Sequence, residues 1–337
     1  MRLWQRGAEF LGCRYAIMGG AMSWVSESHL VAAISNAGGF GVLACGSMSP
    51  ELLANQITAT QQKTTLAFGV NLILLHPQLD QLMQVCIRTG VKTVVLAGGV
   101  PSRETVAVLK AAGVKVIGFA PTAAIGKKLV RDGVGALIIE GSEAGGHIGP
   151  VSTSVLAQEI LPEISQVPVF VAGGIGRGES IVSYLQMGAS GVQLGTRFVC
   201  ATESIAHANF KRAFINAKAR DAVASVQLDP NFPVIPVRAL LNHGSEEFLN
   251  EQSEVIALFK AGKITQYDGQ QRIEHFWAGA LRRAVIDGDV ENGSLMAGQS
   301  VGMVSSEQSC DEILQELVTQ AQSHLAVLRQ ANMELMT

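Results

Sequence analysis

The residue best suited to acid–base chemistry is a histidine in a glycine-rich segment. Residues 136–140 read Ala-Leu-Ile-Ile-Glu, and the nine residues after them contain four glycines together with Glu143 and His147. An imidazole titrates near neutral pH, so it can give or take a proton under physiological conditions. The alternative is a loop histidine that is satisfied by a backbone carbonyl. Because the surrounding glycines leave room for a planar ligand, we take His147 as the candidate acid or base.

The run that precedes this histidine predicts where it lies in the fold. Residues 136–139 are apolar without alternation, which is typical of a strand buried on both faces. Glycine disfavours helix, so a loop is expected after Glu140. In α/β proteins, ligands bind and chemistry takes place beyond the carboxyl ends of parallel strands. His147 is therefore expected at such an end.

Short apolar runs alternate with segments of helical periodicity through the first 200 residues. Strands that are separated by helices must run parallel, and eight such units predict a closed (β/α)8 TIM barrel. The alternative is an open, doubly wound sheet. The expected strands are 15–18, 38–43, 66–75, 92–96, 114–119, 136–140, 167–172 and 191–194.

The alternation stops near residue 200, which indicates a second unit. We expect residues 1–200 to form the barrel and residues 201–300 to form a small, mainly helical cap domain over its mouth. Residues 226–241 are expected to be irregular or extended. Residues 301–337 are expected to form a C-terminal helix that packs back on the barrel.

Glycines at the ends of the last two expected barrel strands suggest a phosphate site. The seventh strand ends in Gly173-Gly174 and the eighth in Gly195-Thr196. In TIM barrels this corner often binds phosphate through backbone N–H groups. The alternative is that the glycines only make tight turns. Because two adjacent strand ends share the feature, we favour phosphate binding.

Four other side chains near the expected mouth each have more than one interpretation. Asn71 lies in an apolar strand, so its amide needs a partner, which is either a cofactor edge or a neighbouring loop. Glu143 either orients His147 or binds a ligand hydroxyl, but solvation is the favoured alternative. Met22 and Trp24 either wall a pocket or pack in the core.

Composition excludes several classes of function. The chain has 48% hydrophobic and 16% charged residues and a net charge of -3, so a large core is expected and nucleic acid is not an expected partner. No apolar run reaches the roughly 18 residues of a membrane span. The start of the sequence lacks an apolar signal core, which predicts a cytoplasmic protein. The five cysteines are scattered and no metal-ligand spacing occurs, so reduced thiols and no metal are expected.

Five segments together resemble the nitronate monooxygenase (2-nitropropane dioxygenase) superfamily. That superfamily includes the FMN-dependent enoyl-acyl carrier protein reductase II, or FabK, to which the motif around His147 and the stretch 288–299 are similar. The resemblance covers nearly the whole chain and implies an FMN-bearing barrel with a small second domain, and a homodimer. The five segments are 18–24, 68–71, 140–149, 172–175 and 193–198.

The resemblance also implies roles for individual residues. His147 would be the catalytic histidine, and FMN would have its phosphate at the seventh and eighth strand ends and its ring against the first glycine loop. Two features depart from the pattern: 95–97 read Val-Leu-Ala where reductases tend to have Thr-Thr-Gly, and Glu140 replaces the glutamine of many nitronate monooxygenases. The implied cofactor-binding residues are Gly19, Gly20, Ala21, Met22, Asn71, Glu140, Gly145, Gly146, Gly173, Gly174, Gln193, Leu194, Gly195, Thr196, Met296 and Gly298.

The expected function is therefore an FMN-dependent oxidoreductase. In the favoured reading, NADH or NADPH reduces FMN, and a trans-2-enoyl thioester, free or attached to an acyl carrier, is reduced in turn. The alternative is a nitronate monooxygenase that oxidises alkyl nitronates with O2 to carbonyl compounds and nitrite. A barrel that only binds flavin, without catalysis, is a third reading.

Overall fold

The computed structural model describes residues 1–334, so residues 335–337 of the expected C-terminal segment lie outside it. Eight parallel strands form one sheet in the spatial order β1-β9-β8-β6-β5-β4-β3-β2, and a parallel bridge between Met18 and Phe40 joins its two edges. The (β/α)8 barrel is confirmed, and the open sheet is wrong. The strands are β1 Ile17–Gly19, β2 Val42–Ala44, β3 Gly69–Ile73, β4 Thr93–Ala97, β5 Lys115–Phe119, β6 Ala136–Glu140, β8 Val169–Ala172 and β9 Gly191–Leu194.

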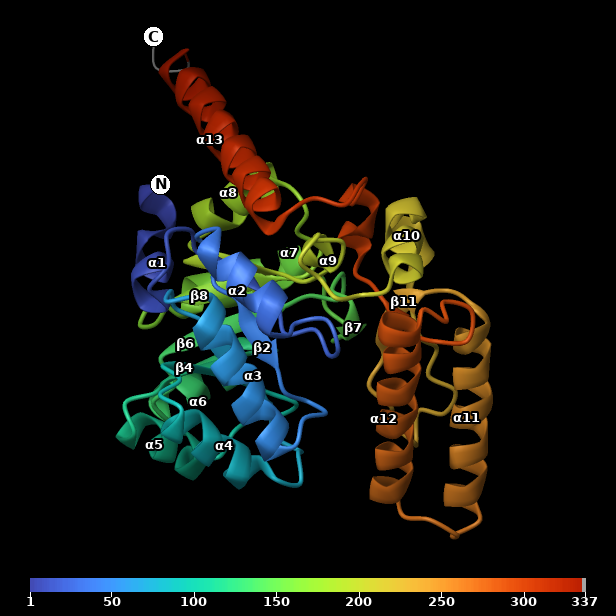
Figure 1. Cartoon of the computed structure of the whole chain (residues 1–337). Coiled ribbons are helices and arrows are strands. Elements are labelled where there is room, and N and C mark those ends of the chain that lie inside the picture. The colour runs from blue at the N-terminus through green and yellow to red at the C-terminus, as the bar shows by residue number, and fades with distance from the viewer. Residues whose placement is uncertain (335–337) are drawn as a thin grey trace.

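Helices surround this sheet on its outer side (Figure 1). Several begin at side chains that accept a hydrogen bond from the first turn, such as Ser49, Ser102 and Thr122, because the first N–H groups of a helix have no intrahelical partner. The helices are α2 Ser28–Asn36, α3 Pro50–Lys63, α4 Leu79–Arg88, α5 Arg103–Ala111, α6 Ala123–Arg131, α7 Thr153–Ile160 and α8 Gly178–Gln186. A 3-10 turn (Arg2–Trp4) and α1 (Gln5–Leu11) precede β1.

The segment 201–300 contains helices and a small sheet. Helices α11 (His243–Lys260) and α12 (Gln266–Arg282) stand side by side next to the barrel (Figure 1). Their core is separate from that of the barrel and includes Phe248 and Trp277. Ahead of them lie α10 (Ala208–Asn216), β10 (Ala222–Ala224) and β11 (Val237–Leu240).

The small sheet connects this segment to the barrel. Strand β11 pairs antiparallel with β10, with β12 (Leu295–Met296) and with β7 (Gly146–His147). Strand β7 lies in the loop that follows β6. The histidine loop is thus hydrogen-bonded to a strand that comes about ninety residues later, within a stretch expected to be irregular or extended.

The last helix, α13 (Cys310–Glu334), packs against α8 and α2 and then extends away from the barrel (Figure 1). Buried Arg197 in α9 (Thr196–Val199) anchors this region, since its guanidinium donates to the Met303 carbonyl at 2.8 Å and to Glu316 at 2.9 Å. Within residues 1–334, no helix combines the length and the hydropathy that crossing a membrane requires.

The start of α8 touches α13 so closely that only glycine fits. Gly178 donates its N–H to Gln320, and a Cβ there would lie 2.2 Å from the Leu317 carbonyl oxygen. Gly279 in α12 has space, because its Cβ would meet nothing nearer than Arg283 at 3.9 Å. These two helical glycines form a matched pair for substitution.

We expect Gly178→Ala to destabilise the protein by about 1–3 kcal/mol, because the added methyl group overpacks the contact between α8 and α13. Gly279→Ala should stabilise it by about 0.5–1 kcal/mol, because alanine favours an exposed helix interior. Urea unfolding of both variants measures whether the free energy of unfolding falls or rises in each. A Gly178→Ala protein as stable as the wild type would contradict this packing.

Candidate active site

The backbone of the histidine loop is held by the small sheet. His147 pairs with Val237 of β11, and the N–H of Ile148 donates to the Pro236 carbonyl at 2.9 Å. Gly146 has φ +78°, a conformation that favours glycine. The loop therefore has a defined path from the carboxyl end of β6 to β11.

The imidazole of His147 faces a carboxylate from α12. Its Nε2 lies 3.2 Å from one carboxylate oxygen of Glu274 and 3.3 Å from the other. Both side chains are about two-fifths exposed, 41% for His147 and 44% for Glu274. Glu274 could not be predicted from the sequence, because no local pattern links residues that are 127 positions apart.

Glu143 does not contact His147 and is not simply solvated. Its carboxylate accepts hydrogen bonds from both the N–H and the hydroxyl of Thr153, each at 2.8 Å. Its carbonyl accepts the N–H of Gln299 at 2.9 Å. Glu143 is partly exposed, and its carboxylate ties the loop to the start of α7 and does not orient His147.

Glu140 is a second ionisable group beside the histidine. It ends β6, lies level with Ala172 of β8, and is partly buried. Burial raises the pKa of this carboxyl from 4.5 to about 7, and the nearby His147 opposes that rise. The mouth of the barrel therefore contains, in Glu140, a carboxyl group that can exchange protons near neutral pH.

Two buried amides line the strands of this mouth. Asn71 donates from Nδ2 to the Val95 carbonyl at 3.2 Å, so the structural hydrogen bond considered for it is present. Gln193 lies on β9, level with Met18 and Ala172, and its side chain is 3.6 Å from the position that a Cβ on Gly20 would take. Such amides can both donate and accept hydrogen bonds.

The predicted cofactor glycines at the strand ends and in the first loop differ in what requires glycine. A Cβ on Gly20 or on Gly195 would make only ordinary contacts, at 3.6 Å and 3.4 Å, and neither has positive φ, so protein packing does not require glycine there. Gly173 and Gly174 have φ of +98° and +70°, so the turn itself requires them. The tight-turn reading thus accounts for Gly173 and Gly174, whereas Gly20 and Gly195 leave backbone open to a ligand.

Other predicted glycines lie in close contacts within the protein. A Cβ on Gly145 would lie 2.5 Å from the Gly298 backbone nitrogen, and one on Gly19 would lie 2.5 Å from the end of the Ile34 side chain. Gly298 itself donates to the Thr196 hydroxyl at 3.0 Å. These contacts bring the histidine loop, the end of β9 and the residues after β12 together.

The remaining predicted residues lie around the same point. A Cβ on Gly195 would be 3.4 Å from the Met22 sulfur, and one on Gly146 would be 3.6 Å from the Met296 sulfur. The Leu194 carbonyl accepts the N–H of Gly20 at 2.8 Å, and Ala21 follows in the same partly buried loop. Residues distant in sequence thus converge at one end of the barrel.

The model of the nitronate monooxygenase family matches residues 5–320. The chain belongs to the nitronate monooxygenase family. Members of this family are FMN-dependent flavoproteins. The chain is therefore an oxidoreductase enzyme of a flavin-dependent family, and the resemblance seen in its motifs is confirmed.

Individual relatives cover nearly the whole chain. It is 31% identical to the "(3aS,4S,5R,7aS)-5-hydroxy-7a-methyl-1-oxo-octahydro-1H-indene-4-carboxyl-CoA dehydrogenase" of Mycobacterium tuberculosis, over 96% of this chain and 98% of that protein. The structure of FabK from Thermotoga maritima matches with a TM-score of 0.86 at 33% identity, covering 97% and 98% of the two chains. The structure of a nitroalkane oxidase from Streptomyces ansochromogenes matches with a TM-score of 0.78 at 26% identity, and the match covers 94% of this chain and 98% of that chain.

In this family member, Trp24 lies in the loop after β1 and has an unusual backbone conformation. Its φ is +66°, and among residues 1–334 its buried indole N–H has no acceptor. The Arg282 guanidinium of α12 lies 5.8 Å from the centre of its ring. Positive φ in a bulky residue costs free energy and often marks a functional site. Trp24 therefore joins the first glycine loop to α12.

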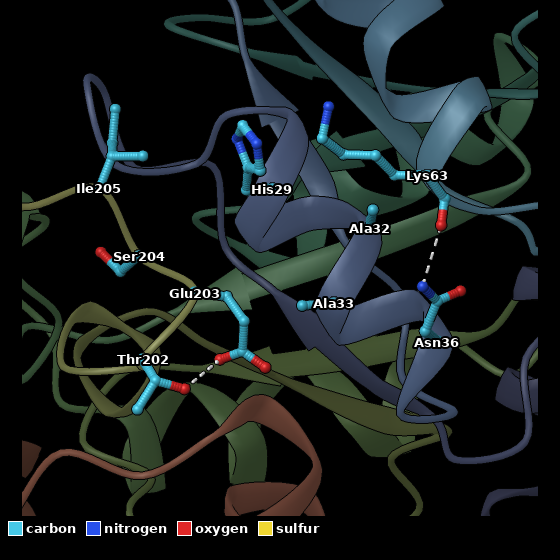
Figure 2. A pocket seen from close by; sticks show the side chains of 9 residues that line it. All are labelled: His29, Ala32, Ala33, Asn36, Lys63, Thr202, Glu203, Ser204 and Ile205. Atoms are coloured by element: carbon cyan, nitrogen blue, oxygen red, sulfur yellow. Dashed lines mark hydrogen bonds between the residues drawn. The ribbon is translucent and has the colours of Figure 1, made fainter.

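A separate hollow of about 460 Å³ lies between α2 and residues 202–205 (Figure 2). Its lining includes His29, Lys63 and Glu203, and the His29 ring is paired with Glu27 at 2.9 Å. None of the lining residues belongs to the site around His147. The hollow is therefore separate from the candidate site at the barrel mouth.

The raised pKa of Glu140 has a consequence for stability. Between pH 4.5 and about 7 the folded protein binds more protons at this carboxyl than the unfolded chain does, so the free energy of unfolding falls as pH rises through this window. We expect Glu140→Gln to remove this contribution and to be more stable than the wild type at pH 8 by roughly 2–3 kcal/mol. Urea unfolding of both proteins at pH 5 and pH 8 measures the difference, and parallel pH profiles would contradict it.

Proposed function

We propose that the barrel mouth binds FMN. Gly20 and Gly195 present open backbone where packing would allow a side chain, which suits a ligand that lies against the main chain. Gln193 places an amide beside Gly20, and amides can pair with the polar edge of a flavin. Gly195 and Thr196 would hold the phosphate, with Gly173 and Gly174 at the neighbouring strand end.

We propose further that the enzyme reduces the double bond of a trans-2-enoyl thioester with NADH or NADPH. The observation that carries this proposal is the likeness to FabK, at 33% identity over nearly all of both chains. The name of the Mycobacterium tuberculosis relative also describes action on a CoA thioester. Bound FMN would supply hydride transfer between the nicotinamide and the carbon substrate.

His147 would supply the proton in this reaction. A hydride added at the β-carbon of the thioester requires a proton at the α-carbon, and an imidazolium can donate one near neutral pH. The geometry supports this role, because β11 fixes the backbone of His147. After the transfer the ring is neutral and regains its proton from water.

Exposed apolar side chains next to this site suit an acyl chain. Ile235 is 55% exposed and directly precedes Pro236, whose carbonyl holds Ile148. Val226, in the segment between β10 and β11, is 60% exposed. Burial of such side chains against a fatty chain would be favourable. The acyl part would therefore lie along the segment before β11.

Nitronate oxidation is the second candidate, and the likeness to the nitroalkane oxidase favours it. In that reaction His147 would act as a base on a neutral nitroalkane, and no nicotinamide would be needed. Both candidates place the same side chain at the reacting carbon. They differ in the direction of proton transfer and in the electron donor.

An anaerobic titration of the purified protein separates the two. We expect flavin absorbance in a 1:1 ratio to protein, bleaching by NADH or NADPH, and recovery on addition of crotonyl-CoA. Bleaching by an alkyl nitronate but by neither nicotinamide would assign nitronate oxidation. A protein that is colourless and does not take up added FMN would contradict the cofactor site itself.

His147→Ala should retain FMN and lose about 10²–10⁴-fold in turnover, because a positioned acid contributes a factor of that size. The flavin should still be bleached by the nicotinamide at the wild-type rate, since that step does not use the proton donor. Stopped-flow absorbance resolves the two half-reactions. An unchanged rate of reoxidation by crotonyl-CoA would refute the catalytic role.

A further inference from the structure

The carboxylate of Glu274 is the closest charged partner of the proposed proton donor. It lies 3.2 Å from His147 Nε2 and belongs to α12, whereas the histidine belongs to the loop after β6. A carboxylate at this distance accepts the Nε2 proton and leaves Nδ1 as the free ring nitrogen. The contact therefore selects the ring atom that can face a substrate.

Other charged groups near His147 do not take this position. Glu140 interacts with the histidine only through its charge, with no hydrogen bond between the two among residues 1–334. Arg238, adjacent in β11 to the partner of His147, donates to the carbonyls of Ser142 and Ala222 at 2.7 Å and 2.6 Å. Its guanidinium is thereby directed to the backbone.

Helix α12 is fixed at the barrel mouth by contacts besides this one. Arg282 follows Glu274 by about two helical turns, so both lie on the same side of α12, and it stacks over Trp24 of the barrel. Trp277, one turn after Glu274 in α12, packs on Phe248 of α11 with ring centres 4.2 Å apart. The position of Glu274 is thus set by the packing of the helix.

We propose that Glu274 is a positioning residue, which accepts the Nε2 proton of His147 and thereby orients Nδ1–H toward the α-carbon of the substrate. This inference rests on the proposed function. The Nδ1 proton forms the new C–H bond as hydride reaches the β-carbon, and the ring is left neutral with its Nε2 proton still held by Glu274. The acid of the reaction is thus assembled from the barrel loop and from α12.

The exposure of the pair makes the proposal testable. An ion pair that is about two-fifths exposed adds little to stability, so removal of the carboxylate should leave the fold intact. A second histidine–carboxylate pair in the same segment provides a control. His243 and Glu246 of α11 are also 3.2 Å apart, and no residue of the site contacts them among the residues described.

We expect Glu274→Gln to lower kcat for crotonyl-CoA reduction by about 10–100-fold, similar to the loss caused by removing the hydrogen-bond partner of a metal-bound histidine. KM and flavin reduction by NADH or NADPH should change less than twofold, and Glu274→Asp should recover part of the loss. Glu246→Gln should behave as the wild type. A kcat of Glu274→Gln within twofold of the wild type would overturn the proposal.

The same substitution in a His147→Ala background tests whether Glu274 acts through the histidine. We expect Glu274→Gln to have no further effect there, because the ring that it orients is absent. An equal fall in kcat in both backgrounds would show that Glu274 does not act through His147. That result would overturn the inference but leave the proposed role of His147 unchanged. If His147→Ala alone reoxidises at the wild-type rate, the proposed function of His147 fails, and the inference fails with it.

Discussion

The pairing of β7 with β11 is the constraint on which the rest of the site depends. A glycine-rich loop has many conformations, and its ordering costs conformational entropy. Main-chain hydrogen bonds to β11 fix the position of His147, and antiparallel pairing of β11 with β12 brings Met296 to the same place. One short strand thereby couples the barrel to residues 201–300.

Close backbone contacts complete this coupling. Gly145 and Gly298 approach each other so nearly that neither can carry a side chain, and Gly298 bonds Thr196 at the end of β9. A larger residue at any of these positions would separate the loop from the strand end. Glycine is therefore needed at this mouth for different reasons. Some glycines leave the backbone accessible, some adopt positive φ, and some allow two backbone segments to approach each other closely.

The sequence predicted what depends on local pattern. All eight barrel strands were found because each is a short apolar run between turns, and His147 was placed correctly beyond β6 because strand direction fixes which ends converge. Glu274 and Arg282 could not be found this way, since they lie in a helix whose position is set by packing. The bond between Glu143 and Thr153 could not be predicted either, because Thr153 lies on the next helix and loop composition does not indicate it.

The spread of the site along the chain has a consequence for biosynthesis. The mouth uses Gly20 near the start of the chain and Gly298 near its end, and β1 finds its partner β9 only after about 170 further residues. Such non-local contacts form slowly, and domains generally fold as units during synthesis. A nascent chain therefore cannot possess this mouth before Gly298 has been translated, so any cofactor bound there must be acquired after that point.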